Sequence, residues 1–338
     1  NGKQVMVPGS LKAVKAIGWF IEEYGIAQIS MNLTNVSITP VHVAFDEVCR
    51  KADARGLRVT GSELVGVIPL NAMLEAGRYF LRKQQRSVGV SDAELIKIAV
   101  RSMGLDELSD FNPREKIIEY MLEDASSARL VSMDLKAFAD ETASESPAPG
   151  GGSIAAYAGA LGVSLGTMVA NLSAHKRGWD ERWEEFSDWA ARGQALKDRL
   201  LYLVDEDTRA FNRIMDAFGL PKGSDEEKAA RHAAIQEASR YAMEVPARVM
   251  ELCLESFTLL HAMADTGNPN SASDAGVGAL CARTGVEGAW LNVKINASGV
   301  EDKAFVEKLL ARGQTVVDQA RSAAAGVLAL VEERIAGH

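Results

Sequence analysis

The sequence is poor in the residues that build metal centres, disulfide frameworks and nucleic-acid surfaces. It has five His in 338 residues, and its three cysteines, Cys49, Cys253 and Cys281, lie far apart. This spacing argues against a zinc knuckle and a disulfide framework, and it fits a reducing compartment. Lys and Arg number 37 against 46 Asp and Glu, which gives a net charge of -9. Because a broad nucleic-acid surface is basic, we expect no nucleic-acid partner, and we expect no metal.

Long apolar runs are also scarce, and a single stretch needs to be tested as a membrane span. Residues 154–172 carry no charge, and Ala, Gly, Ser and Thr fill over half of them. The length alone permits a span, but these small residues contribute little transfer energy. We interpret the stretch as a helix buried at the centre of a bundle. The first residues lack the charged and then apolar pattern of a signal peptide, so we expect a cytoplasmic protein without a membrane span.

The composition, 47% apolar and 25% charged, is that of a folded protein. At about 150 residues per domain, the length favours two domains. Periodicity indicates that the first domain, residues 1–128, mixes helices and strands and so belongs to the α+β class. The predicted helices are 11–24 with Gly25 as its cap, 39–55, 69–82, 91–102 and 113–122, and the predicted strands are 26–33 and 57–64.

The second domain, residues 133–338, shows no convincing strand pattern and is predicted to be all-α. A loop rich in Ser, Pro and Gly, residues 144–152, leads into helices that continue to the C-terminus. Gly and Pro residues mark the predicted breaks between these helices. The breaks are Gly178, Gly193, residues 219–221, Pro246, residues 267–269 and Gly299.

A carboxylate interrupts an apolar stripe in the helix predicted at 194–218. At about 100° per residue, Asp207 falls among Leu and Phe side chains. Burial there should raise the pKa of the Asp207 carboxyl, as a general acid or base near neutrality requires. Alternatively, Asp207 pairs with an Arg or caps another helix. Asp205 falls on the opposite side, and we expect it in solvent or at an interface. The stripe consists of Leu196, Leu200, Leu203, Phe211, Ile214 and Phe218.

Three glycines, Gly150, Gly151 and Gly152, precede the apolar helix. They would let the backbone approach a ligand closely, and the helix start would offer free N–H groups to an anion. The motif is neither a dinucleotide fingerprint nor a P-loop. The alternative is a flexible entry into a buried helix, with Ser153 as its N-cap.

Other polar residues could bind a ligand or serve the fold. Asp274 lies in a polar loop that either orients a heterocycle or caps the next helix. Asn292 and Asn296 are four residues apart on one helix face, where they form ligand contacts or a polar network. Lys176 and Arg177 could hold an anionic group, or could simply end a helix in solvent.

Four segments of the second domain together resemble the formimidoyltetrahydrofolate cyclodeaminase family. The resemblance covers about Met133 to the C-terminus, and the combination of segments is specific. The segments are Ser146-Pro147-Ala148-Pro149-Gly150-Gly151-Gly152-Ser153, Leu203-Val204-Asp205-Glu206-Asp207-Thr208-Arg209-Ala210-Phe211, Gly267-Asn268 leading to Ser273-Asp274, and Gly288-Ala289 leading to Asn292-Val293 and Ile295-Asn296.

The first domain resembles the C-terminal subdomain of glutamate formimidoyltransferase. The order of the two domains is similar to that of the bifunctional formimidoyltransferase-cyclodeaminases. The resemblance implies a ferredoxin-like first subdomain and a homo-oligomer, either a dimer or a larger ring. The family's N-terminal transferase subdomain, with its catalytic His, has no counterpart here, so we expect cyclodeaminase rather than transferase activity. The matching segments are Leu11-Lys12 through Ile17-Gly18-Trp19, Gln28-Ile29-Ser30-Met31-Asn32-Leu33, Gly61-Ser62-Glu63-Leu64-Val65-Gly66 and Ile117-Ile118-Glu119-Tyr120.

The resemblance implies an ammonia-lyase of folate one-carbon and histidine metabolism. Its substrate would be 5-formimidoyltetrahydrofolate, its product 5,10-methenyltetrahydrofolate, and it would need no tightly bound cofactor. The family's acid maps to Asp207, the residue that the helical pattern also selects. The implied substrate contacts are Asp274, Asn292 and Asn296 for the pterin, Gly150, Gly151, Gly152 and Ser153 for a closing loop, and Lys176 and Arg177 for the glutamate tail. The alternatives are a methenyltetrahydrofolate cyclohydrolase and a folate-binding or oligomerising module without catalysis.

Overall fold

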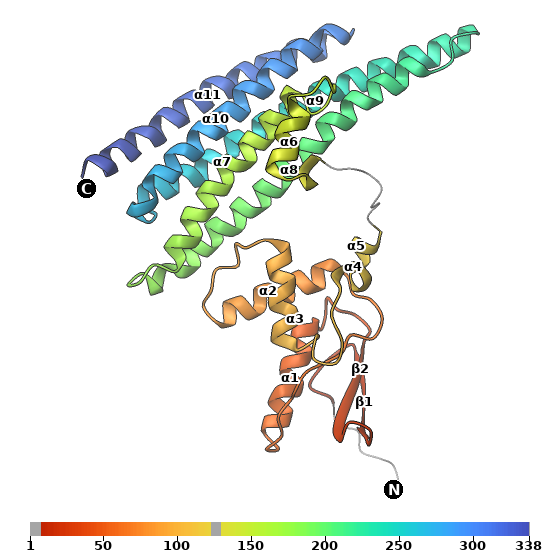
Figure 1. Cartoon of the computed structure of the whole chain (residues 1–338), viewed down its shortest axis with the longest axis vertical. Helices are drawn as coiled ribbons and strands as arrows, with labels where there is room; N and C mark the ends of the chain where they lie inside the picture. The colour runs from red at the N-terminus through yellow and green to blue at the C-terminus, as the bar shows by residue number, and fades with distance from the viewer. Residues whose placement is uncertain (1–7, 123–129, 338) are drawn as a thin grey trace. The chain divides into compact units, whose positions relative to one another are not determined.

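A computed structural model describes residues 8–122 and 130–337 of the chain (Figure 1). The chain divides into two compact units, and the division lies between Asp124 and Ala125. Each unit is described by itself. The predicted end of the first domain at residue 128 lies outside the described residues, so this boundary stays a prediction.

The first unit contains an antiparallel hairpin of two strands, β1 (Val14–Ile21) and β2 (Ile26–Leu33). The strand predicted at 26–33 is confirmed with the same bounds. The helix predicted at 11–24 is wrong, because its apolar residues fit both a helix face and the alternation of a strand, and pairing with β2 favours the strand. Gly25 does not cap a helix but lies in the hairpin turn, where its φ is +63°.

Helices make up most of the regular structure in the rest of the first unit. The first three confirm predicted helices, whereas the helix predicted at 113–122 is divided because Ile117 is extended and forms a bridge with Ile68. The strand predicted at 57–64 is wrong, since these residues form no regular element. The α+β class is confirmed, and the ferredoxin-like topology stays a prediction. The helices are α1 (Val41–Asp53), α2 (Leu70–Lys83), α3 (Asp92–Met103), α4 (Pro113–Lys116) and α5 (Ile118–Met121).

The described residues of the second unit, 130–337, form helices and short loops without a strand, which confirms the all-α class. Four of the predicted breaks fall between helices. Gly193 and Pro246 do not break the chain but lie inside long helices. The α-helices are α6 (Leu135–Thr142), α7 (Gly151–Ala174), α8 (Trp183–Gly219), α9 (Asp225–Thr266), α10 (Ala272–Asn296) and α11 (Lys303–Ala336).

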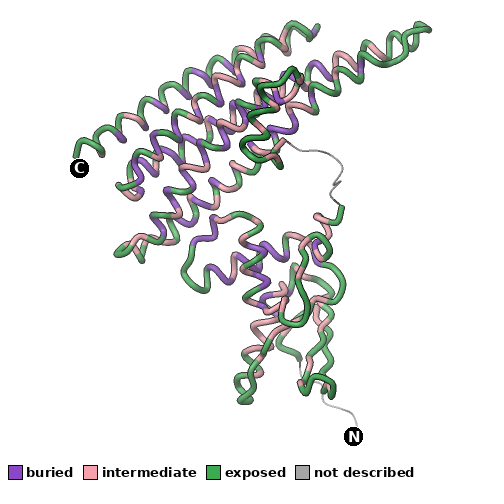
Figure 2. Tube along the Cα trace, in the orientation of Figure 1, coloured by how far each residue is buried: buried purple, intermediate pink, exposed green. Residues whose placement is uncertain are grey.

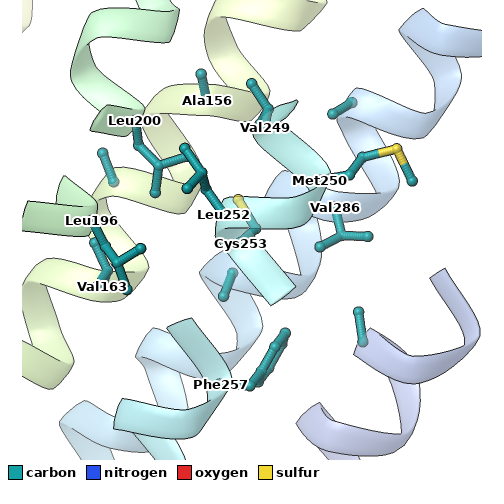
Figure 3. Packing of buried hydrophobic residues seen from close by; sticks show 14 of the residues in the cluster. Ala156, Val163, Leu196, Leu200, Val249, Met250, Leu252, Cys253, Phe257 and Val286 are labelled. Carbon is teal, nitrogen blue, oxygen red and sulfur yellow. The ribbon is translucent and has the colours of Figure 1, made fainter. Parts of the chain in front are cut away.

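α7 is the central helix of the second unit. It packs against α8, α9 and α10, and Figure 2 shows buried positions running along these helices. In Figure 3, Val163 of α7 belongs to the same hydrophobic cluster as Leu200 of α8, Cys253 of α9 and Val286 of α10. Among the described residues, α7 alone is long and apolar enough to cross a membrane, but 61% of its most apolar window is buried inside the unit. This burial supports the prediction of a core helix.

The close packing of α7 depends on positions that lack a side chain. A Cβ added at Gly162 would lie 2.7 Å from the carbonyl oxygen of Gly278 and 2.8 Å from the nitrogen of Ala282, both in α10. Both neighbours are backbone atoms, so neither can move aside unless α10 itself shifts. Gly326 in α11 is different, because a Cβ there would meet nothing within 4 Å.

These two glycines predict opposite effects of the same substitution. Gly162→Ala should lower the free energy of unfolding by about 1–3 kcal/mol, because it overpacks the contact between α7 and α10. Gly326→Ala should raise it by up to about 1 kcal/mol, because Ala favours an exposed helix. Urea denaturation of the two variants measures both effects. Equal effects of the two substitutions would contradict the close approach of α7 and α10.

Candidate active site

The apolar stripe predicted on α8 is buried up to Asp207 and exposed beyond it. Leu200 and Leu203 are 0% and 4% exposed, whereas Phe211 and Phe218 are 39% and 50% exposed. The prediction of a continuous buried stripe is therefore half wrong. The reason is that α7 begins beside Asp207, so the last turns of α8 extend past the helix that covers its first part. Asp207 lies at this border and is partly buried.

The Asp207 carboxyl is bound to the start of α7. Its Oδ2 accepts a hydrogen bond of 2.8 Å from the backbone N–H of Ser153 and one of 3.0 Å from the Ser153 hydroxyl. The N-cap of α7 is Gly150, which has no side chain to satisfy the free N–H groups. Asp207 therefore caps another helix, which was one of the alternatives, and it forms no ion pair with an Arg of residues 8–122 or 130–337. Ser153, predicted to be the N-cap, is instead the third residue of α7.

Gly152 makes this contact possible. A Cβ at position 152 would overlap the Asp207 carboxyl, at 2.5 Å from Cγ and 2.7 Å from Oδ2. A side chain at this position would therefore push the carboxyl away from the helix start. Two residues earlier, the Gly150 backbone is extended, with ψ at -171°.

The surroundings of Asp207 favour its neutral form. Burial raises the pKa of the Asp207 carboxyl above its usual range, while the hydrogen bonds from the Ser153 hydroxyl and N–H act in the opposite direction. No charged side chain in the described part of the chain contributes to this shift. A carboxyl with a raised pKa and no ion-pair partner among the described residues is suited to accept and donate a proton.

Both predicted asparagines lie at the same end of the bundle as Asp207, but they differ in their contacts. The Asn292 amide donates to the Gly288 carbonyl of its own helix, 3.0 Å away, and it lies beside Gly151 at the start of α7. The Asn296 amide donates over 2.7 Å to the carbonyl of Ala242 in α9.

The Asn296 contact explains why Pro246 does not break α9. Proline has no N–H, so the carbonyl four residues earlier, that of Ala242, loses its helical partner. The Asn296 amide takes the place of that partner. The predicted polar network is therefore present at Asn296, and it ties α10 to α9.

Asp274, Lys176 and Arg177 lie at the other end of the bundle. α10 runs antiparallel to α7, and the N–H of Asn268 before α10 donates to the hydroxyl of Ser173 near the end of α7. At 1.5 Å per residue, the 20 residues from Ser153 to Ser173 span about 30 Å. The structure thus brings together Asp207, the 150–153 segment and the two asparagines, and it separates them from the other three predicted site residues of the same chain.

Lys176 and Arg177 also differ in their surroundings. The Lys176 ammonium lies 4.1 Å from the centre of the Trp179 ring, whereas Arg177 is exposed beyond the end of α7. A cation held over an aromatic face is partly withdrawn from solvent but keeps its charge. Either residue could still meet an anionic group.

The two acidic residues before Asp207 are buried, which the sequence did not indicate. Asp205 is 8% exposed and accepts a hydrogen bond of 2.7 Å from the N–H of Leu130, so the prediction of a solvated or interface Asp205 is wrong. Glu206 is 2% exposed and binds the Tyr241 hydroxyl at 2.6 Å and Arg209 at 2.8 Å. The spacing of Glu206 and Arg209, three residues apart, is the signal that could have indicated this pair.

A cavity of about 690 Å³ opens beside Glu206, between α8 and α9. Arg213 and Tyr241 line it, and both contact Glu206. Its volume is in the range of small-molecule sites. Asp207 does not line this cavity, because its side chain is turned by about 100° around α8 toward α7. The candidate acid and the cavity therefore occupy neighbouring faces of one helix.

Comparisons with known proteins agree for both units. The family model described as formiminotransferase-cyclodeaminase matches residues 134–315, and the formiminotransferase domain model matches residues 1–123. The formimidoyltransferase-cyclodeaminase of Gallus gallus is 38% identical over 335 residues, 99% of this chain. The chain spans 62% of the length of that relative.

Two further proteins resemble the second unit. A methenyltetrahydrofolate cyclohydrolase of Methylorubrum extorquens is 42% identical over 176 residues, 52% of this chain and 85% of its own. The crystal structure of formiminotetrahydrofolate cyclodeaminase from Thermotoga maritima is 26% identical, with a TM-score of 0.55 over 61% of this chain and 100% of its own. From the family models and this likeness, the chain belongs to the formiminotransferase-cyclodeaminase family.

Proposed function

We propose that this chain is a cyclodeaminase that converts 5-formimidoyltetrahydrofolate to 5,10-methenyltetrahydrofolate and ammonia. The observation that carries the proposal is Asp207, a partly buried carboxyl with a raised pKa and no ion-pair partner, held at the start of α7. The family supplies the substrate class, and the Thermotoga relative is named for this reaction. The transferase reaction is not part of the proposal.

The reaction requires one proton to move from one nitrogen to another. The formimidoyl group enters in its protonated form, C=NH2+. N10 of the substrate attacks its carbon, the carbon–nitrogen double bond becomes single, and the tetrahedral centre then carries an NH2 group. Asp207 accepts the N10 proton and donates it to this NH2 group, because amide ion is a very poor leaving group. The carbon–nitrogen bond then breaks, ammonia leaves, and the methenyl bridge remains. A carboxyl in this role contributes roughly 10²–10⁴-fold, and holding N10 against the carbon contributes further.

The proposed substrate position follows from the elements around Asp207. The pterin would lie against the start of α7, near Gly151 and Asn292; because residues 151–153 form the first turn of α7, they would bind it as a fixed helix start and not as a closing loop. The reaction forms one carbon–nitrogen bond, breaks another and moves a proton without a change of oxidation state, so we propose no tightly bound cofactor. The place of the reaction would be the cytoplasm, in folate one-carbon metabolism and histidine degradation.

A methenyltetrahydrofolate cyclohydrolase is the second candidate. It is favoured by the Methylorubrum relative, which carries that name and is 42% identical over the second unit. There, water would attack the methenyl carbon, and Asp207 would accept its proton. Both reactions therefore use one carboxyl near the same carbon, and only the products separate them. A folate-binding module without catalysis is the third candidate.

We also propose that a second copy of the chain covers the exposed face of α7 and α10. On α7 the exposed apolar side chains at 154, 161 and 168 recur every seven residues, and α7 carries no charge. This spacing is typical of a helix that packs against further helices, and the neighbouring α10 also exposes apolar side chains. The exposed residues are Ile154, Leu161, Met168 and Leu172 of α7 and Val277, Leu280, Leu291 and Ile295 of α10, each between 36% and 71% exposed.

The second copy would reunite the separated site residues. In a two-fold pair in which the copies of α7 run antiparallel, the end of one α7 lies beside the start of the other. Lys176, Arg177 and Asp274 of one copy would then approach Asp207 of its partner. The tail of the substrate would bind one copy while its pterin binds the other.

Asp207→Asn tests the acid. Asn keeps the size of the side chain and an oxygen for the Ser153 N–H, so the fold should persist. Ammonia release from 5-formimidoyltetrahydrofolate should fall by roughly 10²–10⁴-fold because the amide cannot carry the proton. Asp198→Asn on the same helix is the control, since Asp198 is exposed. Near-normal turnover by Asp207→Asn would contradict the assignment, and formyl product from 5,10-methenyltetrahydrofolate without ammonia release would favour the cyclohydrolase.

Leu161→Arg tests the proposed contact between copies. A charge in the middle of the apolar face should separate the copies and halve the mass measured by sedimentation equilibrium, because a buried unpaired charge is costly. Ile335→Arg, at an exposed residue of α11, should leave the mass unchanged. A Leu161→Arg protein with the wild-type mass would place the contact elsewhere.

Mixed oligomers test the shared site. Asp207→Asn and the double variant Lys176→Ala/Arg177→Ala should each lose activity alone at low substrate. Unfolding and refolding them together should restore about a quarter of wild-type activity, because half of the pairs are mixed and each mixed pair has one complete site. Mixtures that stay as inactive as their components would show that the site lies within one copy.

A further inference from the structure

The two oxygens of the Asp207 carboxyl have different surroundings. Oδ2 accepts both hydrogen bonds from Ser153, at 2.8 and 3.0 Å. Oδ1 accepts none from the described residues, and it is not among the buried polar atoms that lack a partner. Oδ1, which lies against Gly152, is therefore not fully buried and has a free acceptor position that a ligand can use, while Oδ2 is engaged.

This asymmetry decides where a proton can reside. A carboxylate oxygen has two lone pairs, and on Oδ2 both point at donors of Ser153. A proton on Oδ2 would have to displace one of these hydrogen bonds. A proton on Oδ1 displaces nothing, and from there it can reach a nitrogen of a bound molecule.

Ser153 is held firmly enough to maintain this difference. It is 0% exposed, and it is the third residue of α7, where the helix fixes its backbone N–H. Gly152 leaves room for the carboxyl itself, because a Cβ at this position would overlap it. Because the N–H and the hydroxyl of Ser153 both donate to Oδ2, they fix the rotation of the Asp207 side chain as well as its position.

Other charges near this end of the bundle are engaged elsewhere. α7 has Tyr157 as its single titratable side chain. On α8, Asp205 and Glu206 bind Leu130 and Tyr241, and Arg209 binds Glu206. On α10, Glu287 pairs with Arg283 and Arg321, and the Lys294 ammonium lies over the Trp290 ring.

We propose that Ser153 is a positioning residue that divides the tasks of the Asp207 oxygens, so that Oδ2 anchors the carboxyl and Oδ1 carries the proton that is transferred. The inference rests on the proposed function, because it names the oxygen that accepts the N10 proton and returns it to the leaving nitrogen. It adds a role for Ser153 in the chemistry, through Asp207 and without contact with the reacting carbon.

Ser153→Ala removes the hydroxyl donor and keeps the backbone donor. Turnover should fall roughly 10–100-fold, as expected for a lost hydrogen bond to a charged group, with KM changed less than about 2-fold. The titration of Asp207 should move to higher pH, because the lost donor favours the charged form. Carbon-13 NMR of labelled aspartate carboxyls measures this titration, and Asp207→Asn identifies the resonance.

Two more variants separate positioning from folding. Ser153→Cys keeps a side chain of similar size with a weak donor, so it should fall between wild type and Ser153→Ala in both turnover and titration. Ser164→Ala removes a hydroxyl that bonds only within α7, to the Ala160 carbonyl at 2.7 Å, and should leave both unchanged.

The outcomes distinguish this inference from the proposed function. If Asp207→Asn abolishes ammonia release while Ser153→Ala and Ser153→Cys keep the wild-type titration of Asp207, the role of Ser153 is wrong and the acid stands. If Asp207→Asn retains turnover, the proposed function itself loses its acid. A Ser153→Ala protein that loses turnover with an unmoved titration would show a structural role only, and would also overturn the inference.

Discussion

The second unit depends on the absence of side chains along α7. Because Gly162 has no Cβ, α10 approaches α7 to backbone contact, and small residues elsewhere on α7 let α8 and α9 close in as well. The buried hydrophobic cluster that results is continuous across four helices. Gly152 acts in the same way at a polar contact, since the Asp207 carboxyl of α8 fills the space where a side chain would be. The packing of the bundle and the candidate site thus both depend on the small residues of α7.

The contact between Asp207 and α7 joins helix capping to proton chemistry. When charged, the carboxylate suits a helix start, where free N–H groups and the dipole favour a negative charge. Burial disfavours the charged form and outweighs the hydrogen bonds from Ser153, so the pKa of Asp207 is raised. A raised pKa in the folded state means that this group favours folding at low pH, and that this contribution is lost as the pH rises through the folded-state pKa. Burial and the hydrogen bonds from Ser153 therefore act on the pKa of this carboxyl in opposite directions.

Local features could be predicted from the sequence, and features that depend on neighbouring elements could not. The strand 26–33 and the helix after Thr39-Pro40 follow from short-range patterns, and Asp207 stands out because a charge interrupts an apolar face. The prediction of a helix at 11–24 was wrong because the apolar spacing there fits both the helical period and the alternation of a strand, and pairing with β2 favours the strand. Pro246 failed as a break because Asn296, 50 residues later, bonds to the carbonyl that the proline leaves free.

The same limit explains the partial success at the site. A helical wheel assumes one buried face, but α8 is covered by different helices on different sides, so Asp205 and Glu206 are buried too. A helical wheel also gives no information about which end of a bundle a residue occupies. Asp274 was grouped with Asp207 because both lie in the family segments, and Lys176 and Arg177 were added because a basic pair could hold an anionic tail. The antiparallel path of α7 and α10 puts all three at the opposite end.

The order of α7 in the chain has a consequence for synthesis on the ribosome. α7 ends at Ala174 and α10 ends at Asn296, so about 120 residues must be translated after α7 before its last partner is complete. At roughly 5–20 residues per second, this takes about 6–25 s. During that time an uncharged helix of 24 residues is made without its cover. The nascent chain thus exposes an apolar segment that chaperones and membrane-insertion machinery can bind. Early pairing of α7 with α8 is the first contact that covers this segment.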